Sequence, residues 1–393
     1  MKLSPNASNI KYAIRDIVIS AKQVERQSGI KLYYFNIGDP NKFDFDTPDF
    51  LKEALVRAVQ EDNANYYSDS AGDPRLRQEI VLRQKRLWGT SLDTDHVLVT
   101  TGVSEAISFV AASLAPGTEV LVPSPLYPSY LSYFRFYNVV PIQYYTREIE
   151  GWQPDVDDIA KKINEKTQAI LIINPNNPTG AVYSSKVIKQ MADLAGEHNL
   201  LILSDEIYDL LTFDNSFRSV ASLTEIPVLE LNGISKTLLS PGWRLGWMTL
   251  RDDQAQFEEF WELLAKQSRI RLCASTPMQV AVSKVLNREM SHIPGFIEKI
   301  KQRSDYFTKR INDIDGLSVS PPKGAFYAFP RIEKDINDQK FVLELLRSTG
   351  VLFVFGSGFG ELGVKHFRSV VLPRIEIMEE ALDHVEAFVQ KIK

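Results

Sequence analysis

The stretch Leu231-Asn232-Gly233-Ile234-Ser235-Lys236-Thr237 closes an apolar run that begins at Pro227. An apolar run of this length, followed by a glycine turn, predicts a buried strand with a lysine just beyond its end. An ammonium group in that place costs free energy unless it is exposed or used chemically. One chemical use is an imine with a carbonyl compound, which removes the charge. The alternative is a surface loop with a solvated lysine, and this stretch alone leaves both interpretations open.

Arg244 follows eight residues after Lys236, in a second strand-like segment that spans 244–250. A fixed guanidinium there can bind a phosphate in bidentate geometry. On the N-terminal side, helical stretches alternate with apolar strands, which are predicted at 96–100, 119–122, 139–144, 169–173 and 200–204. This alternation predicts an α/β fold with a mostly parallel sheet sandwiched by helices. Ligands of such sheets bind at the carboxyl ends of the strands.

Groups with chemical potential follow four of the predicted strands, namely Gly102, Asn177, Asp205 and Lys236. The Gly102 turn leads into a helix N-terminus, where free backbone N–H groups suit a phosphate. A buried carboxylate such as Asp205 can pair with a ring nitrogen, and Asn177 with Tyr208 can donate to a phenolate oxygen. Together with the lysine, these groups supply what pyridoxal phosphate (PLP) requires, because its protonated ring is an electron sink for a carbanion. Taken singly, Asp205 also fits a helix cap and Asn177 a turn.

Composition narrows the possible functions. Of 393 residues, 44% are hydrophobic and 24% are charged, as in ordinary globular proteins. The net charge of -5 arises from 45 basic and 50 acidic residues without long runs, which argues against a nucleic-acid or membrane-surface partner. The single Cys273 excludes an intrachain disulfide, and the scattered histidines show no metal spacing, so no metal site is predicted. The first thirty residues lack a signal-peptide core, and a cytoplasmic location is expected.

The pattern changes near residue 280. Helical stretches at about 296–313 and 375–391 enclose short predicted strands at 325–329, 351–355 and 367–372. We therefore expect a large PLP-binding domain over 46–280 and a smaller α+β domain over 281–393. The N-terminal segment, 1–45, contains an amphipathic helix at 11–28 and is expected to join the small domain. Thr47 and Pro48 are predicted to be the N-cap and first residue of the next helix.

Several motifs resemble the signatures of class I and II aminotransferases, PLP enzymes of fold type I. They are Asn177-Pro-Thr-Gly180, Ser204-Asp-Glu-Ile-Tyr208, Ser235-Lys236 and Gly242-Trp-Arg-Leu-Gly246. The resemblance runs nearly from end to end. Five further stretches are most similar to the alanine aminotransferase branch: Asn36-Ile-Gly-Asp-Pro40, Arg269-Ile-Arg-Leu-Cys273, Gly324-Ala-Phe-Tyr327, Phe355-Gly-Ser-Gly-Phe-Gly360 and His366-Phe-Arg-Ser-Val-Val-Leu-Pro373.

The resemblance implies how the cofactor ring is held. Lys236 is implied to form the Schiff base and then to move a proton between the substrate Cα and the cofactor C4′. Asp205 is implied to pair with the pyridine nitrogen. Asn177 and Tyr208 are implied to hydrogen-bond the phenolic oxygen. Tyr127 is implied to stack on the ring, where many relatives have a larger aromatic residue.

The resemblance also implies how the phosphate is held. The backbone N–H groups of Val103 and Ser104 bind it together with Arg244. Tyr67 reaches the phosphate in the partner subunit, which implies a homodimer with shared active sites. Some relatives have a serine at the position of Gly233, so one phosphate contact is expected to be missing here.

For the substrate, the resemblance implies that Arg368 binds the α-carboxylate, assisted by Gly38 and Asn177. Arg271 is the candidate for the distal carboxylate of glutamate or 2-oxoglutarate, donated across a dimer interface, because its placement resembles an arginine of aspartate aminotransferases. A structural or solvated Arg271 fits the sequence equally well. Residues 101–114 contain no basic residue that could bind a side-chain carboxylate, which favours alanine over aspartate.

The implied activity is transfer of an amino group between an L-amino acid, with alanine favoured, and 2-oxoglutarate, giving pyruvate and L-glutamate. An aspartate or broad-specificity aminotransferase and a PLP-dependent C–S lyase remain as alternatives. A lyase would release ammonia and a keto acid without a second keto acid. A non-catalytic amino-acid sensor is a further alternative, but such sensors usually need an added DNA-binding domain, for which the match leaves no residues.

Overall fold

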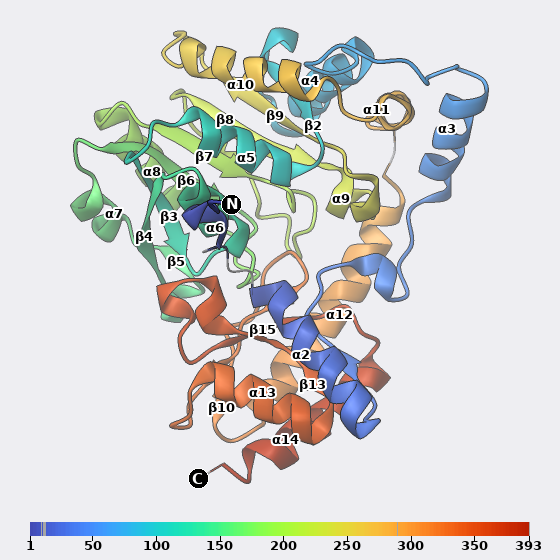
Figure 1. Cartoon of the computed structure of the whole chain (residues 1–393), viewed down its shortest axis with the longest axis vertical. Helices are drawn as coiled ribbons and strands as arrows, with labels where there is room; N and C mark the ends of the chain where they lie inside the picture. Colours follow the sequence, from blue (N-terminus) through green and yellow to red (C-terminus); the bar gives the residue numbers. More distant parts are fainter. Residues whose placement is uncertain (9, 11–12, 289, 393) are drawn as a thin grey trace.

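The structure is a computed structural model that describes residues 1–393 except 9, 11–12, 289 and 393. Its largest element is an eight-stranded sheet in the order β2-β9-β8-β7-β6-β3-β4-β5 (Figure 1). The strands are β2 (Val97–Thr100), β3 (Glu119–Ser124), β4 (Val140–Arg147), β5 (Gln153–Pro154), β6 (Thr167–Ile173), β7 (Leu201–Asp205), β8 (Val228–Gly233) and β9 (Gly246–Arg251). From β8 to β4 neighbouring strands pair in parallel, whereas β9 and β5 pair antiparallel with their neighbours. The predicted mostly parallel sheet is confirmed.

Helices cover both faces of this sheet because its central strands are apolar on both sides. Leu171 and Leu203 belong to a core shared with α5 (Val103–Ser113), α6 (Pro128–Phe136) and α10 (Glu258–Arg271). Their neighbours Ile170 and Ile202 belong to the core that includes α8 (Ser185–Glu197) and α7 (Val156–Lys162). A third core lies beside β2 and β9, under α3 (Asp49–Gln60), α4 (Pro74–Trp88) and α11 (Thr276–Ser283).

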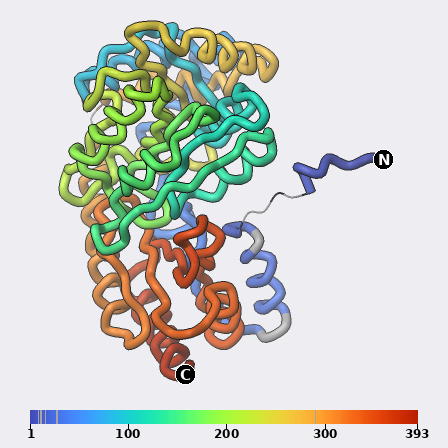
Figure 2. Tube along the Cα trace, turned by 90° about the vertical axis from the view of Figure 1, so that its left-hand side faces the viewer, coloured from blue at the N-terminus to red at the C-terminus, as the bar shows by residue number. Residues whose placement is uncertain are grey.

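The C-terminal part of the chain forms a second layer below the large sheet (Figures 1 and 2). Its helices are α12 (His292–Asn312), α13 (Asp338–Thr349) and α14 (Ile375–Val389), and its strands are β10 (Leu317–Ser318), β11 (Tyr327–Ala328), β12 (Arg331–Ile332), β13 (Val351–Leu352), β14 (Val354–Phe355) and β15 (Phe367–Val370). The N-terminal β1 (Tyr33–Tyr34) pairs in parallel with β13, and Val370 donates its N–H to Phe35 O. In the same region Arg368 of β15 donates to Asn36 O.

The helix predicted at 11–28 appears as α2 (Ala13–Ser28), and positions 11–12 lie outside the described residues. The predicted cap of α3 is wrong. The helix begins at Asp49, Pro48 takes the N-cap position, and no side chain caps it. The hydroxyl of Thr47 donates instead to Leu239 O at 2.7 Å, a contact between segments 192 residues apart. A buried tertiary acceptor therefore replaces the local cap.

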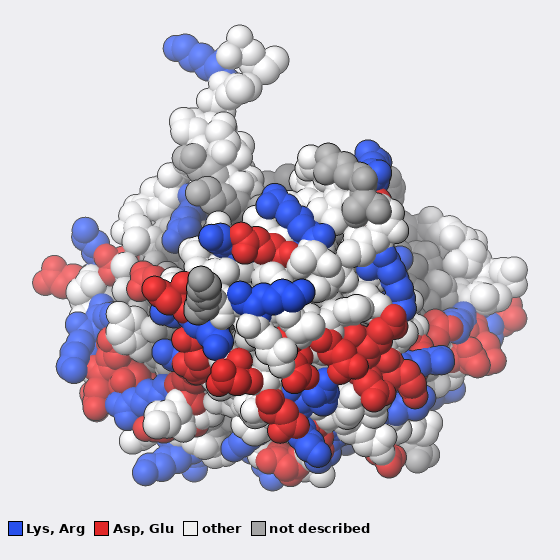
Figure 3. All heavy atoms as spheres, turned by 90° about the horizontal axis from the view of Figure 1, so that it is seen from below, with Lys and Arg blue, Asp and Glu red and all other residues white. Residues whose placement is uncertain are grey.

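The segment predicted as a strand from Arg244 also differs. The strand begins at Gly246, and Arg244 has a φ of 53°, in the left-handed region. Among the described residues, no helix is long and apolar enough to cross a membrane. Figure 3 shows both basic and acidic side chains over the face seen from below.

Candidate active site

A cavity of about 920 Å³ lies at the carboxyl ends of the large sheet's strands, where residues from the N-terminal and C-terminal parts of the chain meet them. Ten of the twelve predicted site residues line it: Gly38, Val103, Ser104, Tyr127, Asn177, Asp205, Tyr208, Lys236, Arg244 and Arg368. Strand ends bring most of these groups together, as parallel-sheet topology predicts. Tyr67 and Arg271 do not line it.

Lys236 lies in the single turn of α9 (Ile234–Thr237), directly after β8. Its Nζ donates to Gly38 O at 2.8 Å. The pKa of its ammonium is lowered to about 8, chiefly by burial and also by the nearby Arg368 and Arg244, whereas Asp39 and Asp205 oppose this shift. An amine with this pKa is partly neutral near pH 8 and can act as a nucleophile and a base.

Asp205 is the last residue of β7 and is 4% exposed. One carboxylate oxygen accepts from the hydroxyl of the fully buried Tyr130 at 2.7 Å, and the other accepts from Ile207 N at 3.2 Å. Burial raises the pKa of this carboxyl to about 6 although both donors oppose the shift. A cationic ring nitrogen facing Asp205 would stabilise the carboxylate that burial disfavours.

Arg368 is 1% exposed on β15. Its two terminal nitrogens donate to Asn177 Oδ1 at 3.1 Å and to Asn36 O, and its Nε has no hydrogen-bond partner. Within the described part of the chain, no carboxylate lies within ion-pair distance of this guanidinium. A buried guanidinium with only neutral partners is costly, and a bound carboxylate would relieve that cost.

The start of α5 and Arg244 together form a cradle on one side of the cavity. Gly102 is the N-cap of α5, with a φ of 76°, and a Cβ built on it would lie 2.4 Å from Arg244 Nη2. Glycine therefore lets the guanidinium approach the helix N-terminus. In the part of the chain that the structure describes, Arg244 donates only to the carbonyl oxygens of Pro241 and Thr101. Free N–H groups and a cation at one helix end suit a phosphate.

The structure gives a physical reason for Gly233. A Cβ at this position would lie 2.8 Å from Leu245 O and 2.9 Å from the Cα of Gly246. With this backbone, a serine would require β8 and β9 to move apart. A serine side chain at position 233 therefore has no room on this backbone.

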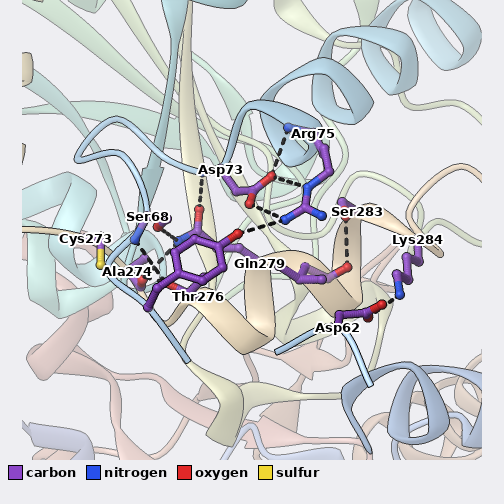
Figure 4. A network of polar contacts seen from close by, with 12 residues as sticks. Asp62, Ser68, Asp73, Arg75, Cys273, Ala274, Thr276, Gln279, Ser283 and Lys284 are labelled. Atoms are coloured by element: carbon purple, nitrogen blue, oxygen red, sulfur yellow. Dashed lines mark hydrogen bonds and ion pairs between the residues drawn. The ribbon is translucent and has the colours of Figure 1, made fainter. Parts of the chain in front are cut away.

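Tyr67 is 82% exposed and does not line its own chain's cavity. Its loop is held by the buried Gln279 of α11, which accepts from Asp73 N at 2.7 Å and donates to Ser68 Oγ at 3.0 Å and to Ala274 O at 2.9 Å (Figure 4). The network presents an aromatic side chain to the outside from a fixed loop.

Arg271 lies at the end of α10 and contacts several residues of its own chain. It donates to Glu105 at 2.7 Å and to the carbonyl oxygens of Ser70 and Val99, each at 3.1 Å. Glu105 also accepts from Thr101 N at 2.7 Å. These contacts tie α10 to the start of α5 and to the Tyr67 loop. Its role in binding a distal carboxylate stays a prediction.

Sequence reasoning did not select several residues that the structure places in or beside the cavity. Asp39, Arg15 and Tyr327 line it, and Tyr130 supports Asp205 from behind. Tyr327 is the last residue of the Gly324–Tyr327 motif, and Tyr130 lies three residues after Tyr127. These positions were signals in the sequence, but only the fold shows what the side chains contact.

Comparison with known proteins identifies the family of this chain. The sequence model described as "Aminotransferase class I and II" matches residues 33–385, most of the chain. The chain belongs to this family. Class I and II aminotransferases depend on PLP, and this aminotransferase has the cavity, anion cradle, lysine and carboxylate that PLP needs.

Three similar proteins carry related names. The solved structure of an alanine aminotransferase from Pyrococcus furiosus has a TM-score of 0.97 and 47% identity, covering 99% of this chain and 100% of the other. Glutamate-pyruvate aminotransferase AlaA of Escherichia coli is 35% identical over 98% of this chain and 97% of its own. Alanine aminotransferase of Mycobacterium tuberculosis is 35% identical over 98% of this chain and 92% of its own.

Proposed function

We propose that this aminotransferase moves the amino group of L-alanine to 2-oxoglutarate and yields pyruvate and L-glutamate. One observation carries the proposal. Lys236, Arg244 and Arg368 line a single cavity, and among the described residues each donates only to neutral oxygens. Such a cavity suits a phosphate-bearing aldehyde and a carboxylate substrate together. The names of the similar proteins support alanine and glutamate as the amino-acid pair.

The cofactor, when bound, supplies an electron sink for the carbanion left when the amino acid loses its α-proton. We assign Asp205 to the pyridine nitrogen, Asn177 and Tyr208 to the phenolic oxygen, and Tyr127 to the ring face. Val103, Ser104 and Arg244 hold the phosphate in this proposal. Tyr208 keeps its proton because burial raises the pKa of its hydroxyl well above the usual value, so it can donate.

Lys236 is the proposed base. Its Nζ would hold the cofactor covalently and, once free, would take up the α-proton of the amino acid and carry it during the transfer. A base is most effective when its pKa lies near the working pH, and burial brings the pKa of Lys236 to about 8. Arg368 and Gly38 orient the substrate so that the α-proton faces this amine.

The positions of the basic residues favour alanine over aspartate as the amino donor. No basic residue occurs in 101–114, and α5 therefore presents no cation for an aspartate side chain. For the distal carboxylate of 2-oxoglutarate, Arg15 lines the cavity of the same chain. Arg271 remains the alternative only if a partner subunit presents it, and its contacts with Glu105 oppose that role. In Arg15→Ala the KM for glutamate should rise while that for alanine stays close to wild type.

We also propose a homodimer, in which the exposed Tyr67 completes the partner's phosphate site. The Tyr67 loop and the exposed Ile270 and Leu272 lie near one another on the chain's α10–α11 side. Residues 46–280 are proposed as the cofactor-binding domain, and 281–393 with 1–45 as the smaller domain. A reducing, cytoplasmic location agrees with the single Cys273.

The decisive experiment follows the absorbance of the purified yellow protein. Alanine and glutamate should bleach the chromophore, and pyruvate should form continuously only when 2-oxoglutarate is present. Faster bleaching by aspartate would overturn the alanine preference, and ammonia release without a keto acid would indicate a lyase. Arg368→Lys should lower kcat/KM for alanine by about 100-fold, because lysine lacks the planar fork that binds a carboxylate.

A further inference from the structure

Tyr327 contacts both Tyr208 and Arg368, which lie far apart in the sequence. It lies on β11, is 3% exposed and lines the cavity. Its hydroxyl oxygen lies 2.9 Å from the hydroxyl oxygen of Tyr208. The guanidinium carbon of Arg368 lies over its ring, 4.8 Å from the centroid. One side chain thus touches both the proposed donor to the phenolic oxygen and the proposed substrate clamp.

Each tyrosine hydroxyl has a single proton, so within this pair one oxygen donates and the other accepts. If Tyr208 donated to Tyr327, it would have no proton for the cofactor's phenolic oxygen. The reverse direction leaves the Tyr208 proton available. It also strengthens Tyr208 as a donor, because a hydroxyl that accepts a hydrogen bond becomes more polarised.

Packing holds this geometry. The Tyr208 ring meets Tyr327 at 87° and Phe326 at 84°, both edge to face. On the other side, a Cβ built on Gly38 would lie 2.1 Å from the Tyr327 hydroxyl oxygen. Glycine at position 38 therefore lets the hydroxyl lie against the backbone whose carbonyl accepts from Lys236.

We propose that Tyr327 is a positioning residue that donates its hydroxyl proton to Tyr208, directs the Tyr208 proton toward the cofactor's phenolic oxygen, and supports the Arg368 guanidinium with its ring. This inference rests on the proposed function, in which Tyr208 faces that oxygen. It gives a role to the last residue of the Gly324–Tyr327 motif, whose chemistry the sequence does not reveal.

The test is a spectrophotometric pH titration of the holoenzyme, which reports the pKa of the linkage between Lys236 and the cofactor. A donor to the phenolic oxygen stabilises the deprotonated linkage, in which the oxygen's negative charge is no longer offset by the neighbouring N–H⁺. Removing the donor should therefore raise this pKa. We expect a rise of about 1 in Tyr208→Phe and of about 0.5 in Tyr327→Phe, the range of one hydrogen bond.

A double variant and a control sharpen the result. Tyr208→Phe with Tyr327→Phe should titrate like Tyr208→Phe alone, because Tyr327 acts only through Tyr208. Tyr144→Phe is the control, since this buried hydroxyl donates to Leu171 O at 2.8 Å away from the cavity, and its titration should match wild type. A shift in Tyr208→Phe without one in Tyr327→Phe overturns the inference and leaves the site assignment intact. No shift in Tyr208→Phe overturns the site assignment, and the inference with it.

Binding of a carboxylate tests the proposed role of the Tyr327 ring. Propionate, a carboxylate without an amino group, should bind Tyr327→Phe with a Kd within twofold of wild type. Tyr327→Leu should bind it about threefold more weakly, because the cation–π contact with Arg368 is lost. Equal Kd values for the Phe and Leu variants would refute the supporting role of the ring. If the Leu variant does not fold, the titration of the Phe variant alone decides the inference.

Discussion

Two buried polar regions beside the large sheet differ in whether a buried arginine has a carboxylate partner from the same chain. In the first, which we call the sheet cluster, Arg83, Gln84, Asp209, Glu230 and Asn232 contact one another. Arg83 donates to Asp209 at 2.6 Å, Gln84 donates to Glu230 at 2.6 Å, and Asn232 donates to both carboxylates. In the second, the cavity, Arg368 is as buried as Arg83, but its hydrogen-bond acceptors among the described residues are neutral oxygens.

This difference distinguishes buried charges that stabilise the fold from buried charges that bind a ligand. A buried cation beside its own chain's carboxylate is already compensated, so removing one partner exposes the cost of burying the other. A buried cation beside neutral oxygens stays uncompensated until an anion arrives, and the chain gives up stability to keep it there. We therefore expect cavity substitutions to affect chemistry, and sheet-cluster substitutions to affect stability.

The largest expected effect is on chemistry. Lys236→Ala should lower kcat by at least about 10³-fold, since both the covalent link and the base are removed. The free energy of unfolding of the cofactor-free protein should be unchanged or higher, because a buried amine is lost. Mass spectrometry after borohydride reduction should find no covalent cofactor, although the cofactor still binds noncovalently.

The control for this variant is Lys301→Ala, which removes an exposed lysine paired with Asp305. Its kcat should equal that of wild type. If Lys236→Ala retained an appreciable fraction of wild-type turnover, Lys236 would not be the base.

The sheet cluster should show the opposite behaviour. Asp209→Ala leaves Arg83 buried without its carboxylate, which should lower the free energy of unfolding by about 3 kcal/mol. Urea unfolding of the cofactor-free protein measures this change. Asp305→Ala, which breaks an exposed ion pair, should cost less than about 1 kcal/mol. Equal losses in the two variants would show that the sheet cluster does not stabilise the fold.

The smallest effect is a dependence of stability on pH. Burial raises the pKa of Glu230 to about 7 and raises that of the neighbouring Glu206. Between the ordinary glutamate pKa and 7, the folded chain holds a proton on Glu230 that the unfolded chain has released, so stability falls as pH rises through this window. For one such group the slope is at most about 1.4 kcal/mol per pH unit.

Glu230→Gln should flatten this slope, and urea unfolding at pH 5, 6 and 7 would detect a difference of about 1 kcal/mol. Glu298→Gln, at an exposed position of α12, should leave the profile of the wild-type protein unchanged. A profile in Glu230→Gln as steep as wild type would mean that Glu230 is ionised in the folded chain throughout this range.

Local patterns accounted for much of the fold and the site. Apolar runs punctuated by glycine and proline predicted the strands near Leu203 and Leu229, and strand ends predicted Asp205 and Lys236. Errors arose where a distant group competed with a local one, as when Thr47 bonded Leu239 O instead of capping α3. Arg271 could not be assigned, because Glu105, its partner, lies 166 residues away in the sequence.

The sequence by itself determined the mostly parallel sheet, the identity of the lysine and carboxylate at its strand ends, and the family resemblance. These follow from residue periodicity and short motifs, which depend on neighbours within a few positions. Only the tertiary structure decided that Tyr130 supports Asp205, that Tyr327 meets Tyr208 and that Arg368 has no carboxylate partner within the described part of the chain. The two tyrosine contacts join residues 75 and 119 positions apart, and such pairings depend on how the elements pack.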